Sequence, residues 1–527
     1  MSCTGGACPA GAEPLIAPSF THFHHLALDR PELEGLPGEI PLGPVEELVQ
    51  LPVPAGDAGE GQPRALPDVV VIDLGDRGPE APLQLRLRRQ ELLALALERV
   101  VLGEVELDRE DPDISGAHGH IQDAVTARRL LVALGALSAC VGWALAAVFL
   151  WETRVPADLR LPRLDVSDYF TAEQLEKTAS FERFLLIDYL LAAVAEIVAL
   201  GVLAWRAPGF ARTLGLGPVG AGIIVGMVTI AVAWAVGLPF ALAEQWWLRR
   251  HGLSEEGYLE WIFTPWAQVL AQAASALVLI AVSMALARRI GRLWWLAGAP
   301  VFVAIAAALA FALPYLVKFD TEPVRDPVLA ADARRLERVT GAGATEVRVA
   351  IVSDYTSLAN AQTMGMGPSE SVVLWDTLLD GRFEDDEVRF VLAHELAHAA
   401  RDHIWKSLAW FALLAFPLAL AVAEVTRRRG GLGLPENVPL AALVLAVLAL
   451  VLAPVSNTIT RHYEAEADWI ALEATADPDG ARGLFEEFAD ADLEDPTPPA
   501  WAQQLFGTHP TVLDRIAMAE AWSRRGR

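Results

Sequence analysis

The chain has 527 residues, of which 53% are hydrophobic and 20% are charged, and its formal net charge is −26. So many apolar residues exclude a chain that is disordered over most of its length. The acidic excess argues against a nucleic-acid-binding protein, which would present a basic surface, and three cysteines are too few for a disulfide framework.

Residues 1–126 form an acidic N-terminal extension rich in Pro and Gly. It contains 22 Asp and Glu against 8 Arg, and therefore more than half of the net charge of the chain. Residues 69–74 resemble a short strand and 83–102 an amphipathic helix, and we expect the rest of the extension to be flexible. We interpret its five histidines as solvated loop residues rather than as metal ligands.

Seven apolar blocks follow the extension. Each has about 18 to 26 residues, and a helix needs roughly 20 to cross a bilayer. The blocks lie at 130–151, 184–205, 218–243, 266–287, 293–317, 408–425 and 438–456. We therefore predict a mainly α-helical, polytopic membrane protein with about seven transmembrane helices.

Two polar modules interrupt this array, and they define the remaining boundaries. Residues 127–317 would contain helices one to five, residues 318–407 the first module, 408–456 helices six and seven, and 457–527 the second module. Because only one pair of spans separates the two modules, they must lie on the same side of the membrane. We expect them to form one small α+β domain, split between two parts of the sequence.

The first module contains the motif H-E-x-x-H, as His394-Glu395-x-x-His398. On a helix, positions i and i+4 share a face, so both imidazoles can bind one zinc ion while Glu395 acts as general base on a water molecule. Composition alone predicts at most about 0.03 such matches in the chain. The sequence therefore predicts a catalytic zinc site, which needs a third protein ligand.

The residues after His398 do not supply that third ligand. A longer H-E-x-x-H-x-x-G-x-x-H motif is excluded, because Arg401 and Ile404 occupy the required Gly and His positions. His403 lies nine residues after His394, about 180° around a continuous helix, so we expect it to support the site indirectly or to be structural.

A carboxylate after the last apolar block is the alternative third ligand. Three acids compete there, Glu464, Glu466 and Asp468. Glu464 and Asp468 are four residues apart and share a helix face, whereas Glu466 points elsewhere. One acid of the pair could bind zinc and the other orient an imidazole, but their spacing alone does not distinguish them.

These residues resemble the integral-membrane zinc metalloproteases typified by the type I CAAX prenyl endopeptidase. That family has seven spans, H-E-x-x-H after the fifth, and N-x-x-x-R-x-x-E-x-x-A-D after the seventh. The chain matches the second motif at Asn457, Arg461, Glu464, Ala467 and Asp468. The resemblance implies that Glu464 is the third zinc ligand, that Asp468, Arg461 and Asn457 support the ligands, and that Glu466 is a bystander.

Two further segments extend the resemblance. Asn360 and Ala361, followed by Val372–Leu374, resemble the family's run before the zinc helix, and we interpret them as an edge strand that binds an extended peptide substrate. His509, in Thr508-His509-Pro510, resembles a family histidine near the substrate, which implies a catalytic role. The shorter HtpX-type proteases share the zinc motifs but have about four spans.

The resemblance implies a metalloendopeptidase with one Zn²⁺ per chain, acting on membrane-associated or lipidated, CAAX-like proteins. An HtpX-like protease of membrane-protein quality control is an alternative. A non-enzymatic seven-span receptor, transporter or scaffold is an alternative of another class. We expect a peptide or protein substrate and the lipid bilayer as partners, and no nucleic acid.

The composition resembles that of a bacterial protein, so we expect a multi-pass protein of the plasma membrane. The resemblance implies that the zinc modules are cytosolic. However, arginines at 206 and 212, at 288–292 and at 427–429 lie in the loops on the other side, and the positive-inside rule would make those loops cytosolic instead.

Overall fold

The computed structural model of the protein describes residues 137–138, 140–263, 266–317 and 321–525. The predicted strand at 69–74, the predicted helix at 83–102 and the rest of the 1–126 extension lie outside these residues. Within the described part, residues from Trp143 onward belong to one compact unit. That unit is mainly helical with one small sheet, as predicted.

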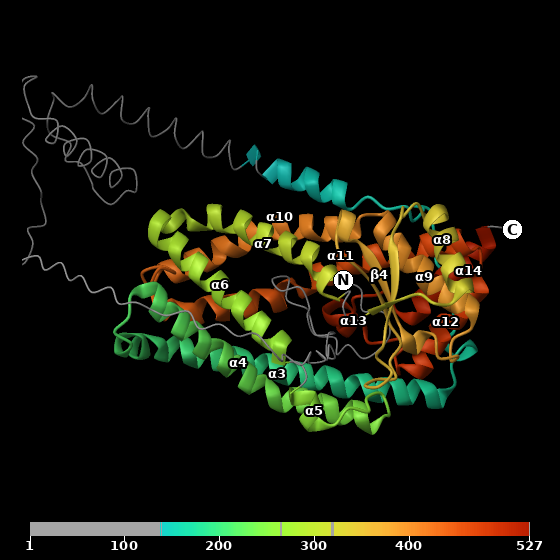
Figure 1. Cartoon of the computed structure of the whole chain (residues 1–527), viewed down its shortest axis with the longest axis horizontal. Helices are drawn as coiled ribbons and strands as arrows, with labels where there is room; N and C mark the ends of the chain where they lie inside the picture. Colours follow the sequence, from blue (N-terminus) through green and yellow to red (C-terminus); the bar gives the residue numbers. More distant parts are fainter. Residues whose placement is uncertain (1–136, 139, 264–265, 318–320, 526–527) are drawn as a thin grey trace, which may run out of the picture. The chain divides into compact units, whose positions relative to one another are not determined.

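Six long helices lie side by side in this unit (Figure 1). They are α3 (Ala172–Thr213), α4 (Pro218–Arg250), α6 (Trp266–Ile290), α7 (Trp294–Val317), α10 (His403–Arg427) and α11 (Val438–Thr475). Contacts join each helix to the next in this order, and α11 returns to contact α3. The bundle therefore closes on itself, and its outward surfaces carry exposed apolar side chains such as Leu191, Val198 and Trp205, as expected of lipid-facing helices.

Five segments of the described chain are long and apolar enough to cross a membrane. One of them, Val269–Tyr315, contains most of α6 and most of α7, which the 3₁₀ turn η3 (Gly291–Leu293) separates. A shorter apolar helix, Cys140–Leu150, falls within the first predicted block. The membrane-protein architecture is thus confirmed, while the count of seven spans stays a prediction.

Helix α11 is longer than a bilayer is thick. Its 38 residues extend over about 57 Å, whereas the hydrocarbon core measures about 30 Å. The apolar run at 438–456 accounts for roughly half of that length. The polar continuation at 457–475 therefore leaves the bundle and enters the domain beside it.

That domain contains a four-stranded sheet in the order β1-β2-β4-β3. Its strands are β1 (Thr321–Pro323), β2 (Glu346–Ala350), β3 (Ala361–Met364) and β4 (Ser371–Trp375). Strands β2 and β4 pair in parallel, and the two outer pairs are antiparallel. Strand β3 contains Ala361 and forms an edge of the sheet. Val372–Leu374, which the sequence analysis assigned to the same edge strand, instead lie in β4, between β2 and β3.

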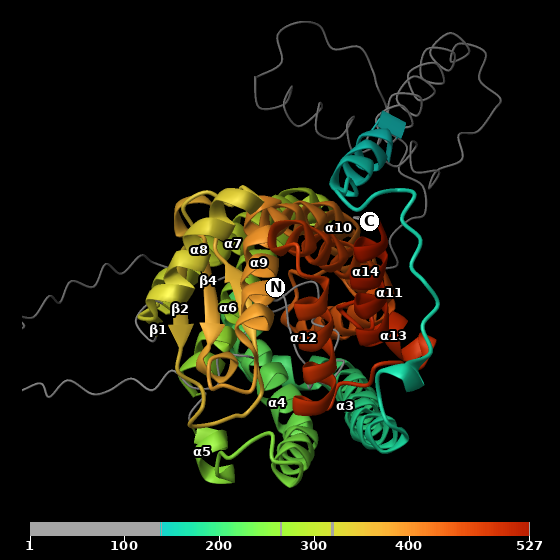
Figure 2. The same ribbon diagram turned by 90° about the vertical axis from the view of Figure 1, so that its right-hand side faces the viewer.

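Five helices complete the domain: α8 (Pro327–Thr340), α9 (Asp385–Ala400), α12 (Pro478–Ala491), α13 (Ala500–Phe506) and α14 (Val512–Arg525). Figure 2 shows the sheet beside α9, with α12 and α14 on the far side of α9. Val372 and Leu374 point from β4 into the core formed with these helices, whereas Val373 packs on the other face against Leu313 of α7. The two polar modules thus share one hydrophobic core.

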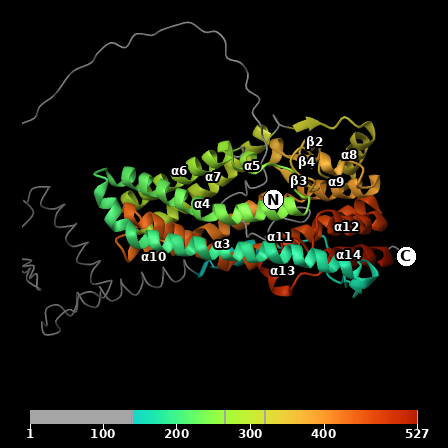
Figure 3. The same cartoon turned by 90° about the horizontal axis from the view of Figure 1, so that it is seen from below.

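Short elements connect these parts. They are η2 (Val166–Asp168), α5 (Tyr258–Phe263), η5 (Gly367–Ser369), η6 (Asp376–Leu378) and η7 (Pro435–Asn437). Seen from below, α3 and α11 both extend from the helical bundle to the domain end (Figure 3). Phe181 and Leu185, early in α3, pack against Leu493, which follows α12. The domain is therefore fixed to the bundle by two long helices.

Candidate metal centre

Helix α9 carries the H-E-x-x-H motif. It begins with a capping box in which Glu384 and Glu387 satisfy each other's backbone amides, and its first turn is acidic, which favours the helix dipole. One face of the helix holds His394 and His398, and both side chains are almost fully buried. The ring centroids lie 4.8 Å apart, because residues four apart lie next to each other on one face of a helix.

The polar continuation of α11 brings Glu464 to these rings. Glu464 Oε2 lies 3.1 Å from His394 Nε2, and Glu464 Oε1 lies 3.6 Å from His398 Nε2. The two imidazole Nε2 atoms are 3.1 Å apart. Among the described residues, these three side chains form a group with one potential ligand atom each, all within 4.8 Å of one another.

This geometry fits a metal ion. Ligand atoms about 2.0–2.1 Å from a tetrahedral zinc lie roughly 3.3 Å from one another, close to the observed separations. Burial alone would raise the pKa of Glu464, but the neighbouring His509 and His398 help to lower it well below its usual value, so the carboxylate is ionised, as a ligand must be. Two His and one carboxylate form a donor set that suits zinc and leaves a fourth position open.

Glu395 is fully buried beside this group. The hydroxyl of Thr363, on β3, lies 2.6 Å from the Glu395 backbone oxygen and 3.0 Å from its Oε2 atom. The edge strand thus touches the carboxylate that the sequence predicts as general base. Sequence reasoning missed Thr363, which has no motif of its own apart from its place three residues after Asn360.

Asp468 lies one helical turn after Glu464 and accepts a hydrogen bond from His394 Nδ1 at 2.8 Å. Arg515, on α14, donates to both Asp468 oxygens at 2.9 and 2.7 Å. Burial alone would raise the pKa of Asp468, but Arg515 and His394 lower it to about 2. Sequence reasoning did not find Arg515, because nothing in the sequence around it links α14 to the motif.

His509 approaches the same centre from the segment between α13 and α14. Its Nε2 atom lies 3.0 Å from Glu464 Oε2, and its Nδ1 atom lies 3.1 Å from the Thr508 hydroxyl. Gln503 donates to the His509 backbone oxygen at 2.6 Å, which holds this segment against α13. The structure therefore brings the predicted His509 to Glu464, one of the three candidate ligands.

Asn457 and Arg461 differ from the expectation that they support the ligands directly. Asn457 Nδ2 donates to the Leu505 carbonyl at 2.6 Å, and Arg461 donates to the carbonyls of Gln503, at 2.9 Å, and Gly507. Both side chains therefore hold α13 against α11. They support the segment that leads to His509, because they face α13 rather than α9.

Asn360 and Ala361 lie at the start of the edge strand. Asn360 Oδ1 accepts from the Ala361 amide at 2.7 Å, and the Asn360 carbonyl accepts from the Trp375 amide at 2.9 Å. Both residues are buried. Asn360 thus sets the conformation with which the strand begins.

Glu466 is not the bystander that the resemblance implied. It points away from Glu464, as its position on the helix predicts, but it is fully buried. Its carboxylate contacts Arg401 at 2.8 Å, His403 at 3.0 Å and the Arg154 amide at 2.7 Å. It therefore ties α9, α10 and the segment after the first apolar helix to α11.

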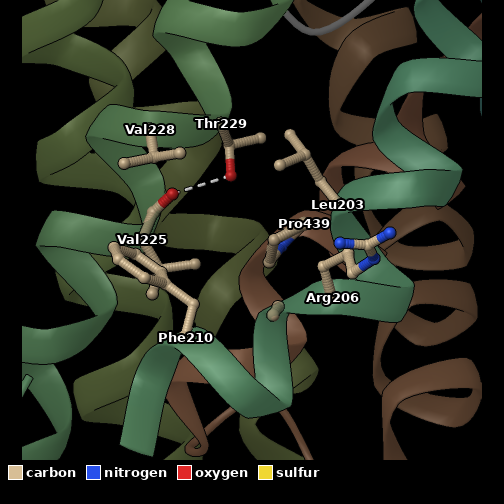
Figure 4. A pocket seen from close by; sticks show the side chains of 8 residues that line it. Leu203, Arg206, Phe210, Val225, Val228, Thr229 and Pro439 are labelled. Atoms are coloured by element: carbon tan, nitrogen blue, oxygen red, sulfur yellow. Dashed lines mark hydrogen bonds between the residues drawn. The ribbon is translucent and has the colours of Figure 1, made fainter. Parts of the chain in front are cut away.

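A separate cavity of about 150 Å³ lies between α3, α4 and the first turn of α11. Figure 4 shows its lining, which includes Leu203, Arg206, Phe210, Val225, Val228, Thr229 and Pro439. Pro439 and Glu464 are 25 residues apart on α11, or about 37 Å along its axis. This cavity is therefore not part of the candidate metal centre.

Several known proteins resemble this chain in sequence. Residues 323–523 match the sequence profile described as "Peptidase family M48". The chain is 27% identical over 248 residues to "Uncharacterized metalloprotease YhfN" of Bacillus subtilis, covering 45% of this chain and 58% of YhfN. It is 29% identical over 211 residues to "Protease HtpX homolog" of Burkholderia cenocepacia, covering 36% of this chain and 73% of that protein.

The solved structure of S. mikatae Ste24p has a similar fold, with a TM-score of 0.58 at 17% identity. The similarity covers 72% of this chain and 96% of the Ste24p chain. Three findings are consistent with one another: the match to a peptidase family, the Ste24p-like fold, and the group of candidate metal ligands, His394, His398 and Glu464. Residues 323–523 are thus similar to peptidase family M48, and the described chain has an integral-membrane fold similar to that of Ste24p.

Proposed function

We propose that this protein is a membrane-embedded, zinc-dependent endopeptidase that hydrolyses peptide bonds in membrane-associated or lipidated proteins. The observation that best supports this proposal is the convergence of His394, His398 and Glu464 beside the buried Glu395, inside the segment that matches family M48. The three residues would hold one zinc ion per chain.

Zinc at this position would polarise the scissile carbonyl and make a neighbouring water molecule more acidic. Glu395 is then the general base, which takes a proton from the attacking water and passes it to the leaving amine. Thr363 keeps the Glu395 carboxylate in one orientation through its hydroxyl. Asp468 fixes the tautomer of His394 by accepting a hydrogen bond from its Nδ1–H, so that Nε2 presents its lone pair.

We assign His509 a catalytic role as the group that stabilises the oxyanion formed from the scissile carbonyl. Its Nε2 atom lies on the same side of the cluster as Glu464 Oε2, at 3.0 Å. Asn457 and Arg461 would act on this step through the α13 segment that they hold. An imidazolium there would donate to developing negative charge.

The edge strand β3 is the proposed binding site for substrate. An extended peptide can add to a sheet edge through backbone hydrogen bonds, which would place its scissile bond beside α9. Asn360 and Ala361 would contact the substrate at the start of this strand. The contact between Thr363 and Glu395 supports the proposal, because it joins the strand directly to the proposed base.

Two substrate classes fit this site. The resemblance of the zinc motifs to those of the CAAX prenyl endopeptidases favours lipidated, CAAX-like substrates, whereas an HtpX-like role in membrane-protein quality control would favour other membrane proteins. A receptor, transporter or scaffold would need neither the metal nor Glu395. Cleavage that depends on Glu395 therefore separates the enzyme from these non-enzymatic alternatives.

The test is cleavage of a peptide panel by the protein in nanodiscs. The panel contains farnesylated C-a-a-X peptides, the same peptides without the lipid, and an unfolded membrane-protein segment. We expect cleavage by the wild type and by the control Asp385→Asn, an exposed acid on the same helix, but not by Glu395→Gln. Equal cleavage by Glu395→Gln would contradict the proposal, and the preferred peptide identifies the substrate class.

We also propose the plasma membrane as the location, with the metal centre on the cytosolic side as the family resemblance implies. The three arginine clusters lie at the other end of the bundle, where Arg429 donates to the Ala204 carbonyl and Arg288 to the Gly433 carbonyl. Thiol labelling of Asp354→Cys and Arg428→Cys, in a background without native cysteines, tests this orientation. Labelling of Asp354→Cys from outside intact cells would reverse it.

A further inference from the structure

The chain reverses direction directly after the zinc helix. Helix α9 ends at Ala400, Asp402 has a left-handed backbone conformation with φ of 54°, and α10 begins at His403. On a continuous helix, residues five apart would lie about 140° apart around the axis and could not touch. The break at Asp402 instead brings His403 back onto His398, with ring centroids 4.9 Å apart.

The contacts of His403 form a relay from His398 to Glu466. His398 Nδ1 lies 2.9 Å from His403 Nδ1, and His403 Nε2 lies 3.0 Å from Glu466 Oε2. If His398 uses Nε2 for the metal, its Nδ1 atom carries the proton and donates to His403. His403 then has its own proton on Nε2 and donates it to Glu466, so every group in the relay has a defined role.

The middle residue of this relay, His403, and its end at Glu466 are fixed in place. The His403 ring stacks on the Tyr463 ring at 4.6 Å and 18°, and the Tyr463 hydroxyl donates to the Leu150 carbonyl at 2.8 Å. Glu466 accepts from the Arg401 side chain and the Arg154 amide, and Lys406 Nζ lies 3.6 Å from it. A carboxylate that is fully buried and held in this way can serve as a rigid anchor.

We propose that His403 and Glu466 are positioning residues for the candidate metal ligand His398, fixing the rotation and the tautomer of its ring. The site then has two unequal supports: His394 meets the carboxylate of Asp468 directly, whereas His398 reaches the carboxylate of Glu466 through a second imidazole. This inference rests on the proposed metal site and adds to it the means by which its second histidine is held.

The test is the affinity of metal-free protein for Zn²⁺, measured by competition with a chromophoric chelator. The visible spectrum of the Co²⁺-loaded protein reports the ligand geometry separately. Loss of such outer contacts typically weakens metal binding by about 10–100-fold. We therefore expect His403→Ala to weaken Zn²⁺ binding by about this factor and to shift the Co²⁺ spectrum.

A conservative replacement and a matched control make the test specific. His403→Gln can still accept from His398 and donate to Glu466, so it should recover most of the affinity. His462→Ala also removes an imidazole from this region, but His462 contacts the Trp151 carbonyl rather than His398, so wild-type affinity is expected. Glu466→Gln keeps the side-chain shape and removes the charge, and it is the second variant if His403→Ala does not fold.

The inference would be overturned if folded His403→Ala had wild-type Zn²⁺ affinity and an unchanged Co²⁺ spectrum. The same result in Glu466→Gln would overturn it if that variant has to replace His403→Ala. His394→Ala separates this failure from failure of the proposed function. If His394→Ala abolishes binding while the relay variants do not, only the relay is wrong. If the wild type itself binds no stoichiometric Zn²⁺, the metal site and the relay are both wrong.

Discussion

His394 Nδ1 lies 2.8 Å from Asp468 Oδ1, although 74 residues separate the two positions in the chain. The contact exists because α11 continues beyond the apolar run of the bundle and lies along α9. The same continuation carries Glu464 to the Nε2 side of the ring. One helix therefore supplies both the third candidate ligand and the group that orients the first.

The pair of Asp468 and Arg515 leads to a prediction about stability. Arg515→Ala would leave Asp468 buried with only His394 as a partner, and loss of one partner from a buried ion pair costs about 3–5 kcal/mol. We expect a large fall in the thermal unfolding midpoint in detergent. Arg525→Ala, which removes an exposed pair with Asp158, is the control and should cost about 0–1 kcal/mol. Equal midpoints for the two variants would contradict the prediction.

The contact between Thr363 and Glu395 predicts an effect on turnover. Thr363→Val keeps the shape of the side chain but removes the hydroxyl, and one hydrogen bond contributes about 0.5–1.5 kcal/mol, or up to about tenfold in rate. We expect kcat to fall by about this factor while the zinc content is unchanged. Thr345→Val removes a hydroxyl that bonds to the Ala342 carbonyl in the turn between α8 and β2, and it should have wild-type kcat.

Asp492 predicts a dependence of stability on pH. It is fully buried, its Oδ1 atom accepts from the Ala359 amide at 3.3 Å, and burial raises its pKa well above the usual value. Because the folded state holds this proton more tightly than the unfolded state, the group stabilises the fold at acid pH, and that stability is lost as pH rises towards the raised pKa.

Asp492→Asn should therefore raise the unfolding midpoint, because an amide can still accept from Ala359 and carries no charge to bury. The gain should be larger at pH 8 than at pH 5, as measured by differential scanning fluorimetry in detergent. Asp479→Asn, at an exposed position in the first turn of α12, should show no such trend. A rise in the unfolding midpoint that is smaller at pH 8 than at pH 5 would contradict this prediction.

Sequence alone predicted the parts of the site that depend on local spacing. The i, i+4 spacing of His394 and His398 fixes their common face, and the apolar runs predict the long helices. The choice between Glu464 and Asp468 could not be made from spacing, because both lie on one face of α11. It depends on how α11 and α9 are aligned, which is a property of the tertiary packing.

The remaining contacts of the site were beyond sequence reasoning for a similar reason. On a continuous helix His403 lies about 180° from His394, so the sequence predicted only an indirect or structural role for it. The left-handed Asp402 ends the helix and brings His403 into contact with His398. Arg515 reaches Asp468 only because the core brings α14 to α11. The contact of His403 depends on the end of a helix, and the contact of Arg515 depends on a helix distant in sequence. Neither feature leaves a periodic pattern in the sequence.

Zinc content measured in parallel with peptide cleavage tests most directly whether His394, His398 and Glu464 hold one catalytic zinc ion. We expect one zinc per chain in the wild type and in Glu395→Gln, with cleavage only by the wild type. Glu464→Ala should lose both zinc and cleavage, and chelation should abolish wild-type cleavage until zinc is restored. Cleavage that persists in metal-free protein, or a full zinc content in Glu464→Ala, would contradict the account.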